Sequence, residues 1–129
     1  MVEMLLTHLR HSKKKTMRDL APDIYRQRMV IEGYPDHALK AEEIKDYLRQ
    51  LSTELDMTTL IDPVTHRSDK YGEAAWIHWE NSGAHFYAWD VPRLFFSVDI
   101  YTCKEFEDQK AVEFTQKFFK ATDIDFKSF

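Results

Sequence analysis

The sequence predicts an α+β fold, a two-layer sandwich in which two main helices cover one face of a mostly antiparallel sheet. Short segments with alternating apolar and polar residues, typical of strands, occupy much of the chain. Two longer segments carry apolar residues at helical spacing. Two helices beside a mostly antiparallel sheet pack most economically as two layers.

Length and composition restrict the class of protein. A chain of 129 residues has the size of one domain, and its 43% hydrophobic and 31% charged content is ordinary for a globular protein. No apolar run approaches the roughly 18 residues that a membrane span needs. A single cysteine excludes an internal disulfide and favours a cytoplasmic location. The net charge of −4 argues against nucleic acid as a partner.

The charge distribution separates two regions. Residues 1–26 carry six basic and three acidic residues, which predicts a basic, partly helical N-terminal extension with short helices at 1–10 and 16–21. The compact domain is expected over residues 27–129. The basic run Lys13 to Lys15 is interpreted as a solvated surface, with an anion or partner contact as the alternative.

The compact domain begins with a strand, a helix and a second strand. Residues 28–34 favour a strand, and Asp36 is a candidate N-cap for a helix over residues 39–56. A second strand over residues 57–61 is expected to end at the Asp-Pro pair that follows it, before a polar loop at 65–71. The helix is predicted from apolar residues at helical spacing: Ile44, Leu48, Leu51 and Leu55.

The rest of the domain favours three antiparallel strands, a helix and a short last strand. Because side chains alternate between the faces of a strand, Phe96, Val98 and Ile100 share one face, and Asp99 and Tyr101 share the other. The expected helix has an apolar stripe of Ala111, Phe114 and Phe118, with Phe119 at its edge. The expected ranges are strands at 72–80, 84–90 and 94–102, a helix at 107–121 and a strand at 123–129.

A serine lies in a turn tripeptide, and the one cysteine follows downstream. Asn81-Ser82-Gly83 favours a tight turn between two aromatic-rich strands, because these residue types are common in turns. Cys103 comes at the end of the next strand. Such a layout can hold one reactive backbone position in a pocket built on a sheet.

These residues also carry a resemblance to a known family. Gly72, Ser82 and Trp89 keep, without gaps, the spacing of a glycine, a serine and a tryptophan in one group of enzymes. The run Val-Asp-Ile-Tyr-Thr-Cys at 98–103 is similar to a strand of the same group. On these residues the chain resembles the small prokaryotic S-adenosylmethionine decarboxylases over most of 29–121.

The resemblance implies a lyase of polyamine biosynthesis, on the route to spermidine. Family members cleave their own chain before the motif serine, here Ser82, and that residue becomes a pyruvoyl cofactor. The pyruvoyl ketone forms a Schiff base with S-adenosylmethionine and acts as the electron sink for decarboxylation. The resemblance implies Cys103 as the proton donor and a homodimer that pairs its sheets as the assembly.

Several residues depart from the family pattern. The glutamate before the serine is Asn81 here, the histidine after it is Gly83, and a hydroxyl residue that assists processing is Ala74. The catalytic histidine five residues after the serine is Tyr87, and the nearest alternative is His85. Because a serine needs a base or an oxyanion site to become a nucleophile, these changes favour a protein that does not process itself.

The candidate ligand-binding residues flank the strand that follows the serine. Trp89 matches the family's tryptophan, Asp90 follows it, and Tyr71 ends a segment that replaces part of the family's ligand pocket. Aromatic residues on these strands are interpreted as core or interface residues, one or two of which can stack an adenine ring. They are Trp76, Trp79, Phe86 and Trp89.

Other readings of the same residues remain open. Ser82 can be an ordinary turn residue, Cys103 a small buried hydrophobe, and His85 a packed sheet histidine. His78 and His85 lie on neighbouring strands, but no cysteine or carboxylate accompanies them at ligand spacing, so no metal site is predicted.

Three functions follow from these readings. The first is a decarboxylase-like protein that is not processed and binds S-adenosylmethionine or a related nucleoside. The second is an active pyruvoyl-dependent decarboxylase of S-adenosylmethionine or another amino acid, with His85 or Tyr87 in the place of the missing histidine. The third is a non-catalytic domain that binds a partner.

Overall fold

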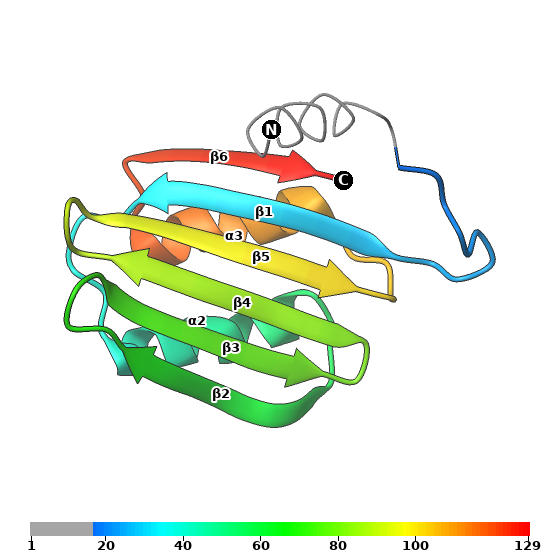
Figure 1. Ribbon diagram of the computed structural model, residues 1–129, viewed down its shortest axis with the longest axis horizontal. Coiled ribbons are helices and arrows are strands. Elements are labelled where there is room, and N and C mark those ends of the chain that lie inside the picture. The colour runs from blue at the N-terminus through cyan, green and yellow to red at the C-terminus, as the bar shows by residue number, and fades with distance from the viewer. Residues whose placement is uncertain (1–16) are drawn as a thin grey trace, which may run out of the picture.

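The computed structural model describes residues 17–129, which form a six-stranded sheet and two helices (Figure 1). The strand order is β2-β3-β4-β5-β1-β6, and every neighbouring pair is antiparallel. The predicted two-layer α+β sandwich is therefore confirmed. The elements are β1 (Gln27–Tyr34), α2 (Ala41–Glu54), β2 (Thr59–Arg67), β3 (Gly72–Trp79), β4 (Ser82–Trp89), β5 (Phe95–Thr102), α3 (Asp108–Phe119) and β6 (Asp123–Ser128).

Both helices lie behind the sheet in Figure 1, and the core fills the space between the two layers. Tyr47 of α2 lies at its centre, fully buried, with its ring centroid 4.6 Å from that of Phe119 and 5.3 Å from that of Phe86. The Tyr47 hydroxyl and the Thr115 hydroxyl form a hydrogen bond of 2.7 Å, so the one polar atom of this ring is satisfied. Burial raises the pKa of Tyr47 well above its usual value.

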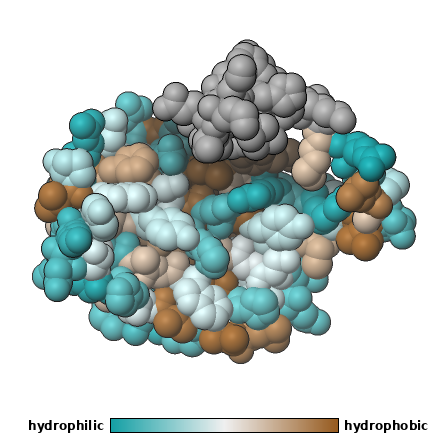
Figure 2. All heavy atoms as spheres, viewed as in Figure 1, coloured by the Kyte–Doolittle hydropathy of each residue, from teal (hydrophilic) through white to brown (hydrophobic). Residues whose placement is uncertain are grey.

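The other face of the sheet, which we call the outer face, is not covered by any helix or strand of residues 17–129 (Figure 1). The expected alternation in β5 is confirmed, because Phe96, Val98 and Ile100 are fully buried while Tyr101 is exposed. Figure 2 shows the outer face as a mosaic of hydrophilic and hydrophobic residues. The side chains that can meet a ligand therefore lie on the outer face, and the helices cover the opposite face.

The second strand is longer than expected. β2 runs from Thr59 to Arg67, so the prediction that it ends at Asp62-Pro63 is wrong, and the polar loop shrinks to residues 68–71. Two register shifts interrupt its pairing with β3 on either side of Ile61. Proline is tolerated because β2 is an edge strand with bulges, where a missing N–H breaks no ladder.

The helix boundaries also differ from expectation. α2 begins at Ala41 with Lys40 as N-cap, so Asp36 does not cap it. The Asp36 carboxylate is bonded to the neighbouring imidazole of His37 instead. The first-turn residue Glu43 accepts a hydrogen bond from the Lys40 N–H at 3.5 Å and so serves the helix start.

The buried stripe of α3 is rotated relative to the expected one. Phe119, expected at the edge, is fully buried, whereas Phe114 and Phe118 are only partly buried. The reason is that Thr115 faces the core, where its hydroxyl donates to the Ala111 carbonyl oxygen at 2.7 Å. The Thr115 hydroxyl is also bonded to the Tyr47 hydroxyl, so this polar side chain is accommodated in the core.

Residues 17–26 contain no helix or strand, so the helix expected at 16–21 is wrong for the part that the structure describes. The helix expected at 1–10 and the basic run Lys13 to Lys15 lie outside the described residues. Neither described helix is long and apolar enough to cross a membrane.

Candidate functional site

The predicted serine turn joins β3 to β4. Glu80 and Asn81 form the connection, so the turn lies earlier than the predicted Asn81-Ser82-Gly83, and Ser82 and Gly83 belong to β4. Ser82 is paired with Trp79 on one side and Thr102 on the other. Its φ of +112° lies in the region that favours glycine, so a serine here holds a strained backbone. Such strain is often found at functional sites, where the surrounding structure enforces it.

Cys103 lies beside this turn, as the layout of the sequence suggested. Its backbone N–H donates to the Asn81 carbonyl oxygen at 3.0 Å, and the Asn81 side-chain amide lies 3.9 Å from the Cys103 sulfur. Cys103 is exposed, so the alternative of a small buried hydrophobe is wrong. The structure therefore brings together the Asn81–Ser82 peptide bond and the one thiol of the chain.

Gly83 is held against the neighbouring strand. A Cβ built on Gly83 would lie 2.3 Å from the carbonyl oxygen of Ile77, closer than real Cβ contacts occur. No side chain fits here unless the backbone of β3 or β4 shifts. The resemblance places a histidine at this position, whereas the backbone of this chain leaves room only for glycine.

The remaining candidate helpers lie farther along β4. His85 and Tyr87 project from the outer face, with ring centroids 6.4 Å apart. Tyr87 pairs across the ladder with Ala74, so two of the positions that depart from the family pattern are direct neighbours. Among residues 17–129, no side chain forms a hydrogen bond with the Ser82 hydroxyl, and His85 lies three residues away along the strand, about 10 Å.

The candidate ligand residues Trp89, Tyr71 and Asp90 gather at the opposite end of β4. Asp90 donates its backbone N–H to the Tyr71 carbonyl oxygen at 2.9 Å, and its carboxylate accepts a hydrogen bond from Arg67 at 3.1 Å. Seven residues of extended strand, about 23 Å, separate Trp89 from Ser82. The predicted site residues thus form two groups at the two ends of the sheet.

A small hollow of about 150 Å³ marks the Trp89 end, and a larger one of about 650 Å³ reaches the Ser82 end. The smaller hollow is lined in part by Tyr71, Tyr87 and Trp89. Residues from four strands line the larger one, which we call the outer hollow: Arg28, Trp76, Ile77, His78, Ser82, Gly83, Ala84, His85, Asp99 and Tyr101.

An ion pair lies in the wall of the outer hollow. Arg28 donates from Nε to Oδ1 of Asp99 at 3.1 Å and from Nη2 to Oδ2 at 2.7 Å. Hydrogen bonding to this carboxylate raises the pKa of Arg28, which keeps the guanidinium charged. The sequence did not mark either residue as part of a site, because only the pairing of β1 with β5 brings them together.

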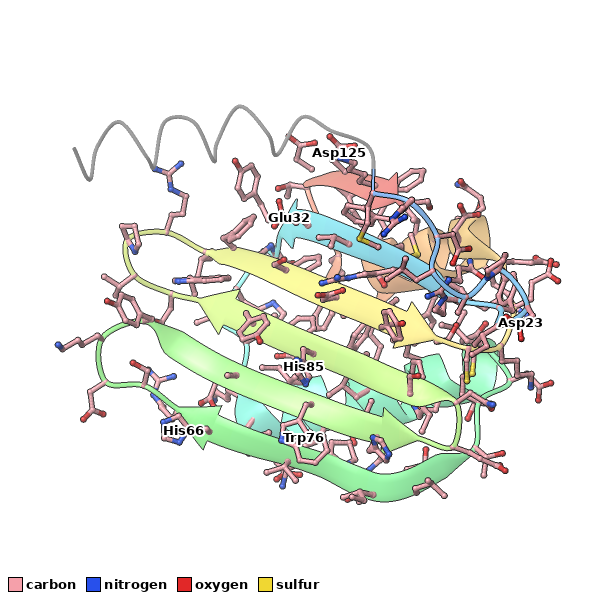
Figure 3. The ribbon with its side chains drawn as sticks, turned by 45° about the vertical axis from the view of Figure 1, so that its right-hand side comes forward. Asp23, Glu32, His66, Trp76, His85 and Asp125 are labelled. Carbon is pink, nitrogen blue, oxygen red and sulfur yellow. The ribbon has the colours of Figure 1, made fainter. Side chains whose placement is uncertain are left out.

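Trp76 and His85 face each other across β3 and β4 on the outer face, and Figure 3 shows both projecting from the middle of the sheet. The other two aromatic residues considered for stacking, Trp79 and Phe86, are fully buried in the core. Trp76 is therefore the one of these residues that offers an accessible ring in the outer hollow. Within the described residues, no group of three or more His, Cys, Asp or Glu side chains is placed to hold a metal ion.

Comparison with known proteins gives the family of this chain. The family model described as S-adenosylmethionine decarboxylase matches residues 30–129. The chain belongs to the S-adenosylmethionine decarboxylase family, as its resemblance implied.

A solved structure supports the same assignment of fold. The crystal structure of the adenosylmethionine decarboxylase from Aquifex aeolicus VF5 superposes with a TM-score of 0.68, over 82% of this chain and 89% of that chain, at 15% sequence identity. At this identity the similarity shows the shared fold alone. A search of curated protein sequences finds no match.

Proposed function

We propose that this chain is an S-adenosylmethionine decarboxylase-like protein that keeps its Asn81–Ser82 peptide bond intact and binds S-adenosylmethionine or a related nucleoside in the outer hollow. The observation that carries the first half is the packing of Gly83 against the Ile77 carbonyl oxygen. This packing leaves no room for a side chain beside the serine unless the backbone shifts. The Ser82 hydroxyl also has no hydrogen-bonded base among residues 17–129 to activate it.

The outer hollow supports the second half of the proposal. Its volume of about 650 Å³ falls within the usual range of small-molecule sites, about 300–1,000 Å³. Trp76 and Tyr101 supply aromatic surface for a planar base, and Arg28 and Asp99 supply a few polar groups that fix orientation.

Intact mass spectrometry of the purified protein tests the first half. A single species near 15.4 kDa is the expected result, and two fragments divided between Asn81 and Ser82 would exclude the proposal. The Ser82→Ala variant is the matched control, because it cannot form an ester at this position and gives the mass of an uncleaved chain.

Calorimetric titration with S-adenosylmethionine tests the second half. Trp76→Ala is expected to weaken binding, because it removes the tryptophan ring that lines the outer hollow. Trp89→Ala is the matched variant for the smaller hollow, where Trp89, Tyr71 and Asp90 remain the predicted ligand residues. A larger loss with Trp89→Ala would move the ligand to that hollow.

Two observations favour an active pyruvoyl-dependent decarboxylase as the second candidate. The carbonyl that Ser82 would attack already accepts a hydrogen bond from the Cys103 N–H, a donor suited to a developing oxyanion, and Ser82 is strained. The attack converts the amide to an ester. β-Elimination then releases the carboxylate of Asn81, and hydrolysis of the resulting dehydroalanine releases ammonia and leaves the pyruvoyl group.

In that second candidate, the pyruvoyl group supplies the electron sink, His85 or Tyr87 moves a proton, and Cys103 protonates the product carbon. It requires both chain cleavage and release of labelled carbon dioxide from S-adenosylmethionine or another amino acid. Activity that survives Ser82→Ala unchanged would exclude a pyruvoyl group derived from this residue.

A homodimer that pairs the outer faces is part of the proposal. Tyr87, which does not line the outer hollow, is about two-fifths exposed there, and aromatic residues are enriched in interfaces. Sedimentation velocity should give twice the chain mass, and Tyr87→Lys should give the monomer.

The third candidate is a non-catalytic domain that binds a partner. It takes precedence if no adenosyl compound gives heat in the calorimetric titration.

A further inference from the structure

We propose that the Arg28–Asp99 ion pair binds the α-amino acid group of the ligand, while Trp76 stacks its base. The inference rests on the proposed function in one respect, which is that the ligand occupies the outer hollow. It adds the recognition chemistry and the orientation of the ligand. Both parts of the ion pair line that hollow, as does Trp76.

The ion pair has unused hydrogen-bonding capacity of both kinds. Arg28 has five N–H donors and uses two of them on Asp99, and each Asp99 oxygen has a further lone pair. The two side chains are 52% and 33% exposed in the single chain, so these groups are not blocked by other residues of the same chain. A ligand carboxylate can take the free edge of the guanidinium while its ammonium group takes the free side of the Asp99 carboxylate.

The charges of the outer hollow match a zwitterion. Among the described residues that line it, Arg28 and Asp99 supply one fixed positive and one fixed negative charge. A simple anion would gain from Arg28 and be repelled by Asp99, and a simple cation would meet the reverse. An α-amino acid group carries both charges on adjacent atoms, so it satisfies the two side chains together.

The register of the sheet places the ring at a suitable distance. Asp99 lies directly opposite His85, and His85 lies directly opposite Trp76, so the three residues form one line across the sheet. Two strand spacings, about 10 Å, separate Asp99 from Trp76. In an S-adenosyl amino acid, ribose and a short thioether chain separate the base from the α-carbon by a similar length.

This orientation has a consequence at the serine. Asp99 pairs with His85 and Thr102 pairs with Ser82, so Asp99 and Ser82 are three positions apart along the ladder, about 10 Å. An α-amine held by Asp99 is then out of bonding distance of Ser82. The bound state therefore agrees with a protein that keeps its chain intact.

Calorimetric titration with three probes tests the inference. S-adenosylhomocysteine carries the base and the amino acid group, 5′-methylthioadenosine lacks the amino acid group, and methionine lacks the base. The uncharged sulfur of the first two probes removes any contribution from a sulfonium charge. The wild-type protein is expected to bind S-adenosylhomocysteine about ten times more tightly than 5′-methylthioadenosine, because of the charge-assisted contacts to the amino acid group. It is also expected to bind S-adenosylhomocysteine more tightly than methionine, because methionine has no base to stack on Trp76.

Arg28→Met is the decisive variant, and Arg49→Met is its control. Arg49 holds Asp62 in the same two-bond geometry, at 2.9 and 2.8 Å, but does not line the outer hollow. Arg28→Met should reduce the preference for S-adenosylhomocysteine over 5′-methylthioadenosine to about one, with 5′-methylthioadenosine affinity unchanged. Arg49→Met should keep the preference at its wild-type value.

The outcomes separate this inference from the proposed function. If Arg28→Met keeps the preference, or if wild type binds both nucleosides equally, the ion pair does not bind the head group and the inference is wrong. If no probe binds the folded wild-type protein, the proposed function fails as well. If circular dichroism shows Arg28→Met unfolded, Arg28→Lys replaces it, and an undiminished preference in that variant would equally overturn the inference, because lysine lacks the planar fork.

Discussion

The backbone N–H of Cys103 donates a hydrogen bond to the carbonyl oxygen of Asn81 over 3.0 Å. This bond ties the end of β5 to the turn that begins β4, and it does not depend on the thiol. The backbone thus holds position 103 beside the Asn81–Ser82 bond, and the hydrogen bond would persist with a different side chain there.

Replacing the thiol should therefore leave the protein stable. Cys103→Ser is expected to change the free energy of unfolding by less than about 0.5 kcal/mol, because the side chain is exposed and the hydrogen bond is made by the backbone. Urea denaturation measures this. Cys103→Pro removes the N–H and should cost clearly more, so equal losses in the two variants would contradict the role of the backbone bond.

Restoring the family's histidine after the serine should destabilise the fold. Gly83→His is expected to lower the free energy of unfolding by about 1–3 kcal/mol, because its Cβ collides with the Ile77 carbonyl oxygen. Ala74→Ser is the matched restoration on the neighbouring strand, where the side chain is half-buried on the outer face, and it should cost little. A Gly83→His protein as stable as wild type would show that the backbone gives way.

A buried hydrogen-bond chain should contribute to stability. The Trp79 indole N–H donates to the Ser52 hydroxyl at 2.7 Å, and that hydroxyl donates to the Leu48 carbonyl oxygen at 2.8 Å. Ser52→Ala leaves the fully buried indole N–H without a partner, which costs about 1–3 kcal/mol in urea denaturation. Combined with Trp79→Phe, the same change should cost much less, and a fully additive double variant would disprove the coupling.

The imidazole of His37 should titrate above its usual pH. Its two nitrogens face the carboxylates of Asp36 and Glu43, and hydrogen bonding, first to Asp36 and then to Glu43, raises the pKa of His37 above 6.5. Only the doubly protonated ring can donate to both. The resulting stabilisation is complete below the unfolded pKa of about 6.5 and is lost as the pH rises through the folded pKa.

NMR titration of the His37 ring protons measures this shift. Glu43→Gln should lower the His37 pKa towards 6.5, while Glu42→Gln, in the same helical turn but paired with Lys45, should change it less. If the two variants shift the pKa equally, the helix N-terminus as a whole is responsible and the Glu43 contact is not.

Much of the fold could be predicted because its strands are half-buried. The alternation in β4 and β5, such as Phe86 and Val98 inward against Tyr87 and Asp99 outward, follows from one face packing on the helices. β2 could not be predicted as well, since its bulges break the alternation and Pro63 is a stop signal in most strands.

The site could be predicted only in part. The turn at Ser82 and its proximity to Cys103 follow from residue types and the family resemblance. The Arg28–Asp99 pair joins residues 71 positions apart through a strand order that places β1 between β5 and β6, and no local pattern specifies that order. The closed packing at Gly83 likewise depends on a backbone distance that residue types do not report.

The single layer of helices has a consequence for how such a protein can diverge. Residues that maintain the fold and residues that can meet a ligand stand on opposite sides of the same strands, as Phe86 and His85 do on β4. Substitutions on the outer face, for example at the position of Ala74, leave the residues that pack on the helices unchanged. The residues that meet a ligand can thus change one at a time while the fold stays stable.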